Sequence, residues 1–164
     1  MNRMKAVAAV WTMACLEVRA DDRLDFQVQG AITPSCALVA DRIRLDLGSV
    51  AAGELGSVGS ASRWRRASFM AVDCIGATRA SVTLRATPHP DDPRYLAAVG
   101  EARGVAIEMQ SVRGQALPPD GSTPVDFIWE GNHAELGFEA RYVRVGALQP
   151  GTAGATAQVQ IRWE

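Results

Sequence analysis

The sequence predicts an all-β protein, an antiparallel sandwich built as one domain. Short runs in which apolar and polar residues alternate recur along the chain, and Gly, Pro and Asp residues separate them. No long stretch shows the apolar spacing of an amphipathic helix. The length of 164 residues is enough for one hydrophobic core, and we find no internal repeat or second domain.

The first 20 residues are typical of a secretory signal peptide. Arg3 and Lys5 precede an apolar run from residue 6 to residue 16, and a small residue, Ala20, ends the segment. We therefore expect residues 1–20 to be removed and the mature chain to start at Asp21. Two alternatives are a packed N-terminal helix and cleavage after Ala14. The apolar run is too short to span a membrane, which takes about 20 residues.

The composition of the mature chain excludes several classes of function. Its formal charge is −3, because the leader removes Arg3, Lys5, Arg19 and Glu17 from the 17 basic and 18 acidic residues of the whole chain. Lysine is absent after Lys5 and the arginines are scattered, so we expect no nucleic acid partner and no direct membrane insertion.

Two cysteines, Cys36 and Cys74, remain after the leader. In an exported protein an even pair predicts a disulfide bond. Zinc is a poor alternative, because the only histidines, His89 and His133, lack the spacing of metal ligands.

The alternating runs place most of the strands. We expect strands around residues 43–47, 67–71, 82–86, 105–109, 136–142 and 157–163, a loop at 88–93 and a short helical turn at 95–98. With the remaining short runs this gives roughly seven strands after Cys36, about the number in an immunoglobulin-like sandwich.

Both ends of the mature chain carry an apolar ridge. At the C-terminus, alternate residues share one face of a strand that reaches the penultimate position: Ala157, Val159, Ile161 and Trp163. Near the N-terminus a second alternating run comprises Leu24, Phe26, Val28, Gly30 and Ile32. Because chain ends usually fray, a ridge of this kind needs a cover, and two of them suggest that strands are exchanged between chains.

In their order and spacing, several short patterns resemble the subunits of chaperone–usher fimbriae, such as type 1 and P fimbriae. They are Phe26-x-x-x-Gly30-(x)5-Cys36, Leu47-Gly48-Ser49-Val50, Phe69 to Cys74, Gly104-Val105-Ala106-Ile107, Leu136 to Tyr142, and Thr152-Ala153-Gly154 before the terminal ridge.

The resemblance implies an immunoglobulin-like sandwich that lacks its last strand and is completed by donor-strand exchange. Residues 21–35 would be the donor extension, with Leu24, Phe26, Val28, Gly30 and Ile32 entering a neighbouring subunit, and 36–164 the pilin domain. The groove would lie along the edge strand formed by Ala157, Val159, Ile161, Trp163 and Glu164. Implied partners are neighbouring pilin subunits, a periplasmic chaperone and an outer-membrane usher, and the implied location is a cell-surface fimbrium that supports adhesion, reached through the periplasm.

Other interpretations stay open at this point. The N-terminal run could be an edge strand of the chain's own sheet, and the C-terminal ridge could be closed within the chain. Trp129, beside Asn132 and His133, could stack on a sugar, which would make the protein a self-contained secreted carbohydrate-binding sandwich. The sequence lacks a Gly-x-Ser-x-Gly elbow, so we predict no enzyme, no catalytic residues, no cofactor and no metal.

Overall fold

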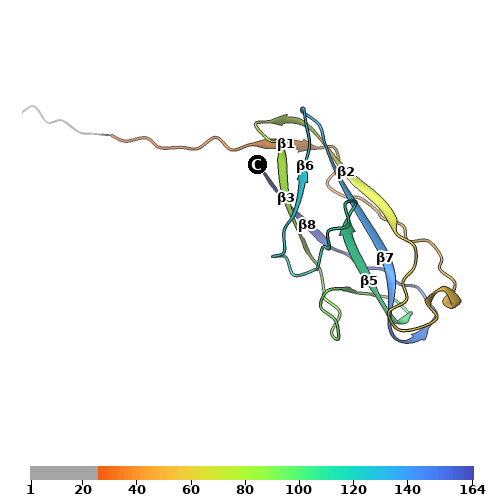
Figure 1. The fold of residues 1–164 in the computed structure, drawn as a ribbon. Coiled ribbons are helices and arrows are strands. Elements are labelled where there is room, and N and C mark those ends of the chain that lie inside the picture. The colour runs from red at the N-terminus through yellow and green to blue at the C-terminus, as the bar shows by residue number, and fades with distance from the viewer. Residues whose placement is uncertain (1–25) are drawn as a thin grey trace, which may run out of the picture. The chain divides into compact units, whose positions relative to one another are not determined.

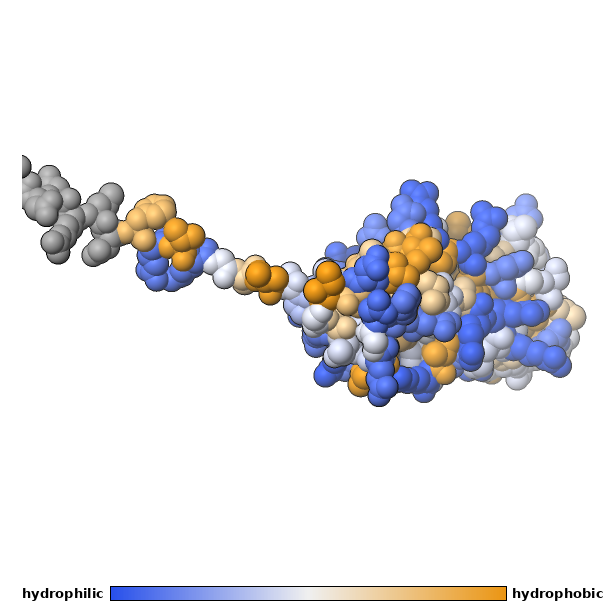
Figure 2. Space-filling model, turned by 90° about the horizontal axis from the view of Figure 1, so that it is seen from above, coloured by the Kyte–Doolittle hydropathy of each residue, from blue (hydrophilic) through white to orange (hydrophobic). Residues whose placement is uncertain are grey.

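The computed structural model describes residues 26–164, and the chain divides into two units, residues 1–31 and 32–164. The predicted leader (1–20) and the first donor residue, Leu24, lie outside the described residues. In the first unit the described part is extended, and its apolar side chains Phe26 and Val28 are 86% and 79% exposed. Figure 2 shows hydrophobic residues (orange) open to solvent along this segment.

The second unit is an all-β sandwich, as predicted (Figure 1). Its elements in chain order are β1 (Ser35–Leu38), the 3-10 helix η1 (Ala52–Leu55), β2 (Arg65–Ile75), β3 (Arg79–Arg85), β4 (Leu96–Ala97), β5 (Arg103–Ser111), β6 (Val125–Ile128), β7 (Ala134–Gln149) and β8 (Gln158–Trp163). Within residues 26–164, no helix is long and apolar enough to cross a membrane.

Two antiparallel sheets form the layers of the sandwich. The larger has the order β1-β2-β7-β5-β4, and the smaller has the order β6-β3-β8. Strand β7 is long enough to pair with β2 near its start and with β5 along the rest of its length. In the smaller sheet β3 lies between β6 and the C-terminal strand, so β8 is an edge strand.

The core lies between the inward faces of the two sheets. Alternating residues of β3, such as Val82 and Leu84, meet Leu136 and Phe138 of β7, and these side chains are almost completely buried. Phe138 also contacts the ring of Phe127 in a tilted arrangement, with 5.4 Å between ring centroids. The alternating residues of β3 and β8 and the inward-facing residues of the larger sheet therefore form one continuous core.

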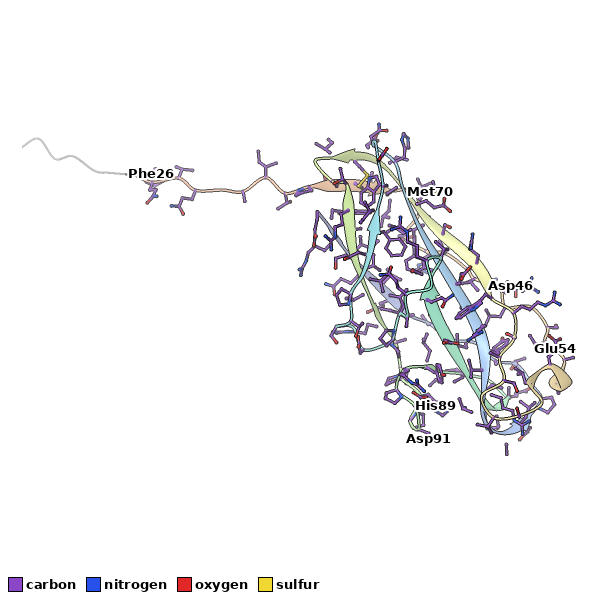
Figure 3. The ribbon with its side chains drawn as sticks, viewed as in Figure 1. Phe26, Asp46, Glu54, Met70, His89 and Asp91 are labelled. Carbon is purple, nitrogen blue, oxygen red and sulfur yellow. A yellow bond between two sulfur atoms is a disulfide. The ribbon has the colours of Figure 1, made fainter. Side chains whose placement is uncertain are left out.

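The predicted disulfide bond is present. Cys36 in β1 is bonded to Cys74 in β2, and Ser35 pairs with Ile75 beside it. The bond therefore joins the first strand of the domain to its neighbour in the larger sheet, and Figure 3 shows it as a yellow bond near the end of β1.

Two predictions of secondary structure were wrong. The run at residues 95–98 is no helical turn, because Leu96 and Ala97 pair with Ile107 and Ala106 as β4. The run at residues 43–47 keeps its alternation, but it forms no strand. Among the described residues, residues 40–50 make no backbone–backbone hydrogen bond. The alternation predicted an extended chain correctly, but a strand also needs a partner, and this segment has none.

Candidate functional site: a groove beside the C-terminal strand

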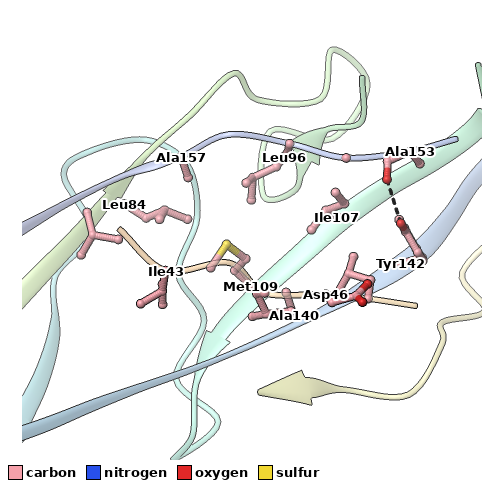
Figure 4. A pocket seen from close by; sticks show the side chains of 15 residues that line it. Ile43, Asp46, Leu84, Leu96, Ile107, Met109, Ala140, Tyr142, Ala153 and Ala157 are labelled. Carbon is pink, nitrogen blue, oxygen red and sulfur yellow. Dashed lines mark hydrogen bonds between the residues drawn. The ribbon is translucent and has the colours of Figure 1, made fainter. Parts of the chain in front are cut away.

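The site is a groove whose two walls are β8 and the unpaired segment 41–48. Three hollows follow one another along it and share lining residues. The first, of about 940 Å³, has both Ile43 and Ile161 in its lining, and the second, of about 280 Å³, has Leu45 and Val159. The third adjoins the second at Asp46, Tyr142 and Ala153. Figure 4 shows the middle hollow, with Ile43 and Asp46 on one wall and Ala153 and Ala157 on the other.

The floor of the groove is the hydrophobic core itself. Leu84, Leu96, Ile107 and Met109 line the middle hollow, although the last three belong to β4 and β5 in the opposite sheet. The two sheets are thus not closed against each other along this side, and core side chains are reached from outside.

The apolar face of β8 is incompletely covered. Ile161 and Val159 lie directly opposite Val82 and Leu84 of β3, on the same face of the same sheet. Val82 and Leu84 are 0% and 1% exposed, whereas Ile161, Val159 and Trp163 are only half-buried. The predicted ridge is therefore real, and the difference arises because β3 has a strand on both sides and β8 on one.

The main chain of β8 is open on the same side. Arg79 and Glu164 exchange two backbone hydrogen bonds, of 2.8 and 3.0 Å. In an antiparallel pair such bonded pairs alternate with unbonded ones. The N–H and C=O groups of Val159, Ile161 and Trp163 therefore point away from β3, toward the groove, where no other described residue pairs with them.

The opposite wall has the same character. Ile43, Leu45 and Leu47 are half-buried against the core, while Arg44 and Asp46 between them are exposed. Each wall therefore has unpaired backbone groups and a row of apolar side chains. The arrangement can accept one extended chain with apolar side chains at every second position.

Tyr142 separates the middle hollow from the third one. Its hydroxyl group donates a 2.8 Å hydrogen bond to the carbonyl oxygen of Ala153 (Figure 4). Partial burial, with a smaller effect of the Asp46 carboxylate, raises the pKa of Tyr142 above its usual value. Val99 and Gly154 also exchange two backbone hydrogen bonds, so the segment leading into β8 is held in place at this end of the groove. Sequence reasoning missed the part played by Tyr142, because nothing in its strand marks it as different from a core position.

Trp129 is not an exposed sugar platform. Its ring packs edge-on against Trp163, with centroids 5.8 Å apart, and it contacts the core. Its indole Nε1 atom is buried without a hydrogen-bond partner among the described residues. The tryptophan instead supports the last residue of the apolar ridge.

Polar clusters elsewhere on the described part of the chain do not form a chemical site. His89 and Asp91 lie on the loop between β3 and β4 (Figure 3). In the same loop Arg94 hydrogen-bonds to Asp92 and lowers the pKa of that carboxyl group. No group of three or more His, Cys, Asp or Glu residues within residues 26–164 is placed to hold a metal ion.

Comparison with known proteins connects this chain to a family. The family model described as "Fimbrial protein" matches residues 24–164. Protein LpfE of Salmonella typhimurium is 33% identical over 135 residues, which cover 79% of this chain and 77% of LpfE. Protein FimG of Escherichia coli K12 is 27% identical over 162 residues, which cover 96% and 95% of the two chains. The crystal structure of the P pilus rod subunit PapA has the same fold, with a TM-score of 0.67 at 18% identity, covering 79% of this chain and 99% of PapA.

Proposed function

The chain belongs to the fimbrial protein family as a subunit of chaperone–usher fimbriae, and on that premise we propose that it polymerises by donor-strand exchange and supports cell adhesion. Its groove receives a strand from a neighbouring subunit, and its own residues 21–35 are donated to the next. The family is one of structural subunits rather than enzymes, in agreement with the prediction from sequence.

The observation that carries the proposal is that β8 has both an incompletely covered apolar face and unpaired backbone groups. The half-exposed apolar face of Val159, Ile161 and Trp163 lies beside the unpaired N–H and C=O groups of the same residues. An unprotected edge of this kind promotes aggregation, and soluble proteins normally cover it. One added strand covers the apolar face and pairs with the open backbone at once, because its backbone bonds to the edge and its side chains enter the hollows.

The N-terminal extension has the properties that such a strand needs. Residues 24–32 span about 30 Å when extended, similar to the length of residues 155–163 along the groove. Phe26, Val28 and Ile32 are highly exposed in the structure, with Ile32 at 103%. Burying these three and Leu24 contributes roughly 6–12 kcal/mol before the costs of ordering are subtracted. Gly30 occupies the one inward position without a side chain, which suits a narrow part of the groove.

Assembly then requires temporary protection of the groove. We propose that a periplasmic chaperone fills it first and that an outer-membrane usher replaces the chaperone strand by the extension of the next subunit. The route to the cell surface is through the periplasm, which also supplies the oxidising conditions for the bond between Cys36 and Cys74.

The test is thermal unfolding of a protein that begins at Cys36, with and without a synthetic peptide of residues 21–35. Peptide at 100 to 1,000 times its dissociation constant stabilises the fold by about 3–4 kcal/mol, which raises the melting temperature by about 10 °C.

A matched pair of peptides makes the test specific. Gly30→Leu places a side chain on the inward face and abolishes the stabilisation, whereas Ala31→Leu changes the outward face and leaves most of it. A truncated protein that is stable, monomeric and indifferent to all three peptides would sink the proposal.

A further inference from the structure

We propose that the groove is filled by residues 24–32 of a second copy of this same chain, in one register that the charges on the outer face of the strand select. This inference rests on the proposed donor-strand function, and it adds the identity of the partner and the alignment of the two strands. It comes from residues that face away from the hollows and that the donor-strand argument does not use.

The apolar face limits the possible registers. All strand pairs within the described sheets are antiparallel, so we take the entering strand to be antiparallel to β8. A shift of one residue would turn its apolar side chains out to solvent, so only shifts of two residues compete. With Leu24 opposite Trp163, the apolar row continues as Phe26 opposite Ile161 and Val28 opposite Val159.

This register pairs opposite charges twice. On the outer face Arg23 lies opposite Glu164, and Asp25 lies opposite Arg162. Arg162 is exposed, and it makes no ion pair with another described residue. The side chain of Glu164 is 43% exposed, with Arg79 at 3.7 Å on its other side. Arg162 therefore has no charged partner among the described residues, and the Glu164 carboxylate, although paired with Arg79, is exposed enough to meet an incoming strand.

The two neighbouring registers pair like charges. A slip of two residues in one direction puts Arg23 opposite Arg162 and Asp21 opposite Glu164. A slip in the other direction puts Asp25 opposite Glu164. Like charges directly opposite each other in an antiparallel pair are destabilising, and opposite charges are stabilising. The pattern Arg-x-Asp in the extension thus matches the pattern Arg-x-Glu at the end of β8 in one alignment only.

Because both patterns belong to one sequence, the occupant that they select is another copy of the chain. The remaining outward positions agree with this, since Gln27 lies opposite Gln160 and Gln29 opposite Gln158. These four glutamines are uncharged, and on β8 both are exposed. Cysteines at these four positions can therefore report the register without changing the charged residues that determine it.

The experiment uses four double-cysteine variants of the full mature chain, each allowed to assemble and then oxidised mildly. Gln27→Cys with Gln160→Cys, and Gln29→Cys with Gln158→Cys, report the proposed register. Gln27→Cys with Gln158→Cys, and Gln29→Cys with Gln160→Cys, report the two slipped registers. These outward positions are unbonded pairs on the groove side of β8, where the Cβ atoms of an antiparallel pair approach most closely.

We expect a ladder of covalently linked chains on a non-reducing gel for the first two variants, and monomers for the other two. Each cysteine occurs in one expected and one excluded pair, so poor reactivity of a single site cannot produce the pattern. Cross-linking in a slipped pair, or equally in all four, overturns the register.

Charge reversal tests the cause. Peptides of residues 21–35 with and without Asp25→Arg are bound to the mature chain with and without Arg162→Asp. We expect each single reversal to weaken binding roughly 3- to 5-fold and the double reversal to restore it to within about 2-fold. The differences should vanish near 1 M salt, where charges are screened within about 3 Å.

The outcomes separate this inference from the proposed function. A peptide that binds in a Gly30-dependent way but ignores both reversals leaves donor-strand exchange standing and refutes the charge-set register. A mature chain that binds this peptide but stays monomeric at every concentration excludes a second copy as the partner. Failure of every peptide to bind refutes the proposed function itself.

Discussion

Replacing Tyr142 by Phe should destabilise the end of the groove where the chain turns into β8. The substitution removes one oxygen atom, and with it the 2.8 Å hydrogen bond to the carbonyl oxygen of Ala153. The ring stays in place against the core, so no cavity forms. Val99 and Gly154 continue to exchange their backbone hydrogen bonds, so the segment should loosen rather than detach.

The expected magnitude follows from what the bond satisfies. A hydrogen bond of this kind contributes about 0.5–1.5 kcal/mol, and a buried carbonyl group left without a partner costs about 1–3 kcal/mol. Ala153 is only half-buried, so water can replace part of the lost bond. We therefore expect a loss of about 1 kcal/mol in the free energy of unfolding, or about 2–4 °C in melting temperature.

The chain offers its own control, since Tyr95 is the only other tyrosine. Tyr95 is also half-buried, but its hydroxyl group makes no hydrogen bond to another described residue. Thermal unfolding at neutral pH should therefore separate Tyr142→Phe from Tyr95→Phe. If the two variants melt at the same temperature, the hydrogen bond to Ala153 does not contribute as argued.

Alkaline pH provides a second measurement of the same site. The pKa of Tyr142 is raised above 10.0, so its neutral form is favoured in the folded state. Stability from this group is complete below pH 10 and is lost as the pH rises toward the folded pKa. Tyr142→Phe should remove this part of the alkaline loss of stability, and Tyr95→Phe should not.

Two further predictions concern residues that do not line the groove, one in a turn and one in β5. The carboxylate of Asp120 accepts hydrogen bonds from the Thr123 hydroxyl group and from backbone N–H groups, and the Thr123 bond contributes most to lowering the Asp120 pKa to about 2. The stability that these bonds provide is therefore lost as the pH falls from about 4 toward 2. Thr123→Val should raise the pKa of Asp120 in an NMR titration, and an unchanged pKa contradicts this account. A Cβ atom on Gly104 would lie 2.2 Å from the carbonyl oxygen of Ala147, while Gly114 has a similar positive φ and open space around it. Gly104→Ala should lower the melting temperature far more than Gly114→Ala. Similar losses in the two variants would show that the destabilisation comes from the positive φ and not from the contact with Ala147.

The sequence predicted the strands because a strand with one buried face leaves a visible period of two. The runs at residues 67–71, 105–109 and 136–142 became the central strands β2, β5 and β7 of the larger sheet. The disulfide bond between Cys36 and Cys74 followed from the cysteine count of an exported chain. The resemblance to fimbrial subunits, carried by patterns along the whole chain, is confirmed by the family model over residues 24–164.

The sequence could not show which extended segments have partners. Residues 43–47 and 159–163 carry the same alternation, yet one is an unpaired wall and the other is an edge strand. Alternation records which side chains face a core, whereas pairing depends on which backbone lies alongside. For the same reason the sequence predicts a helical turn at residues 95–98, although pairing with β5 makes Leu96 and Ala97 a strand.

By itself, then, the sequence determined the alternating faces, the apolar ridges at both ends and the charges between their apolar residues, because these are properties of residue order. Only the tertiary structure decided that the C-terminal ridge has a neighbour on one side and solvent on the other. That difference makes Val159 half-exposed and Leu84, directly opposite, buried. It depends on the packing of segments far apart in the chain, and so no local pattern can encode it.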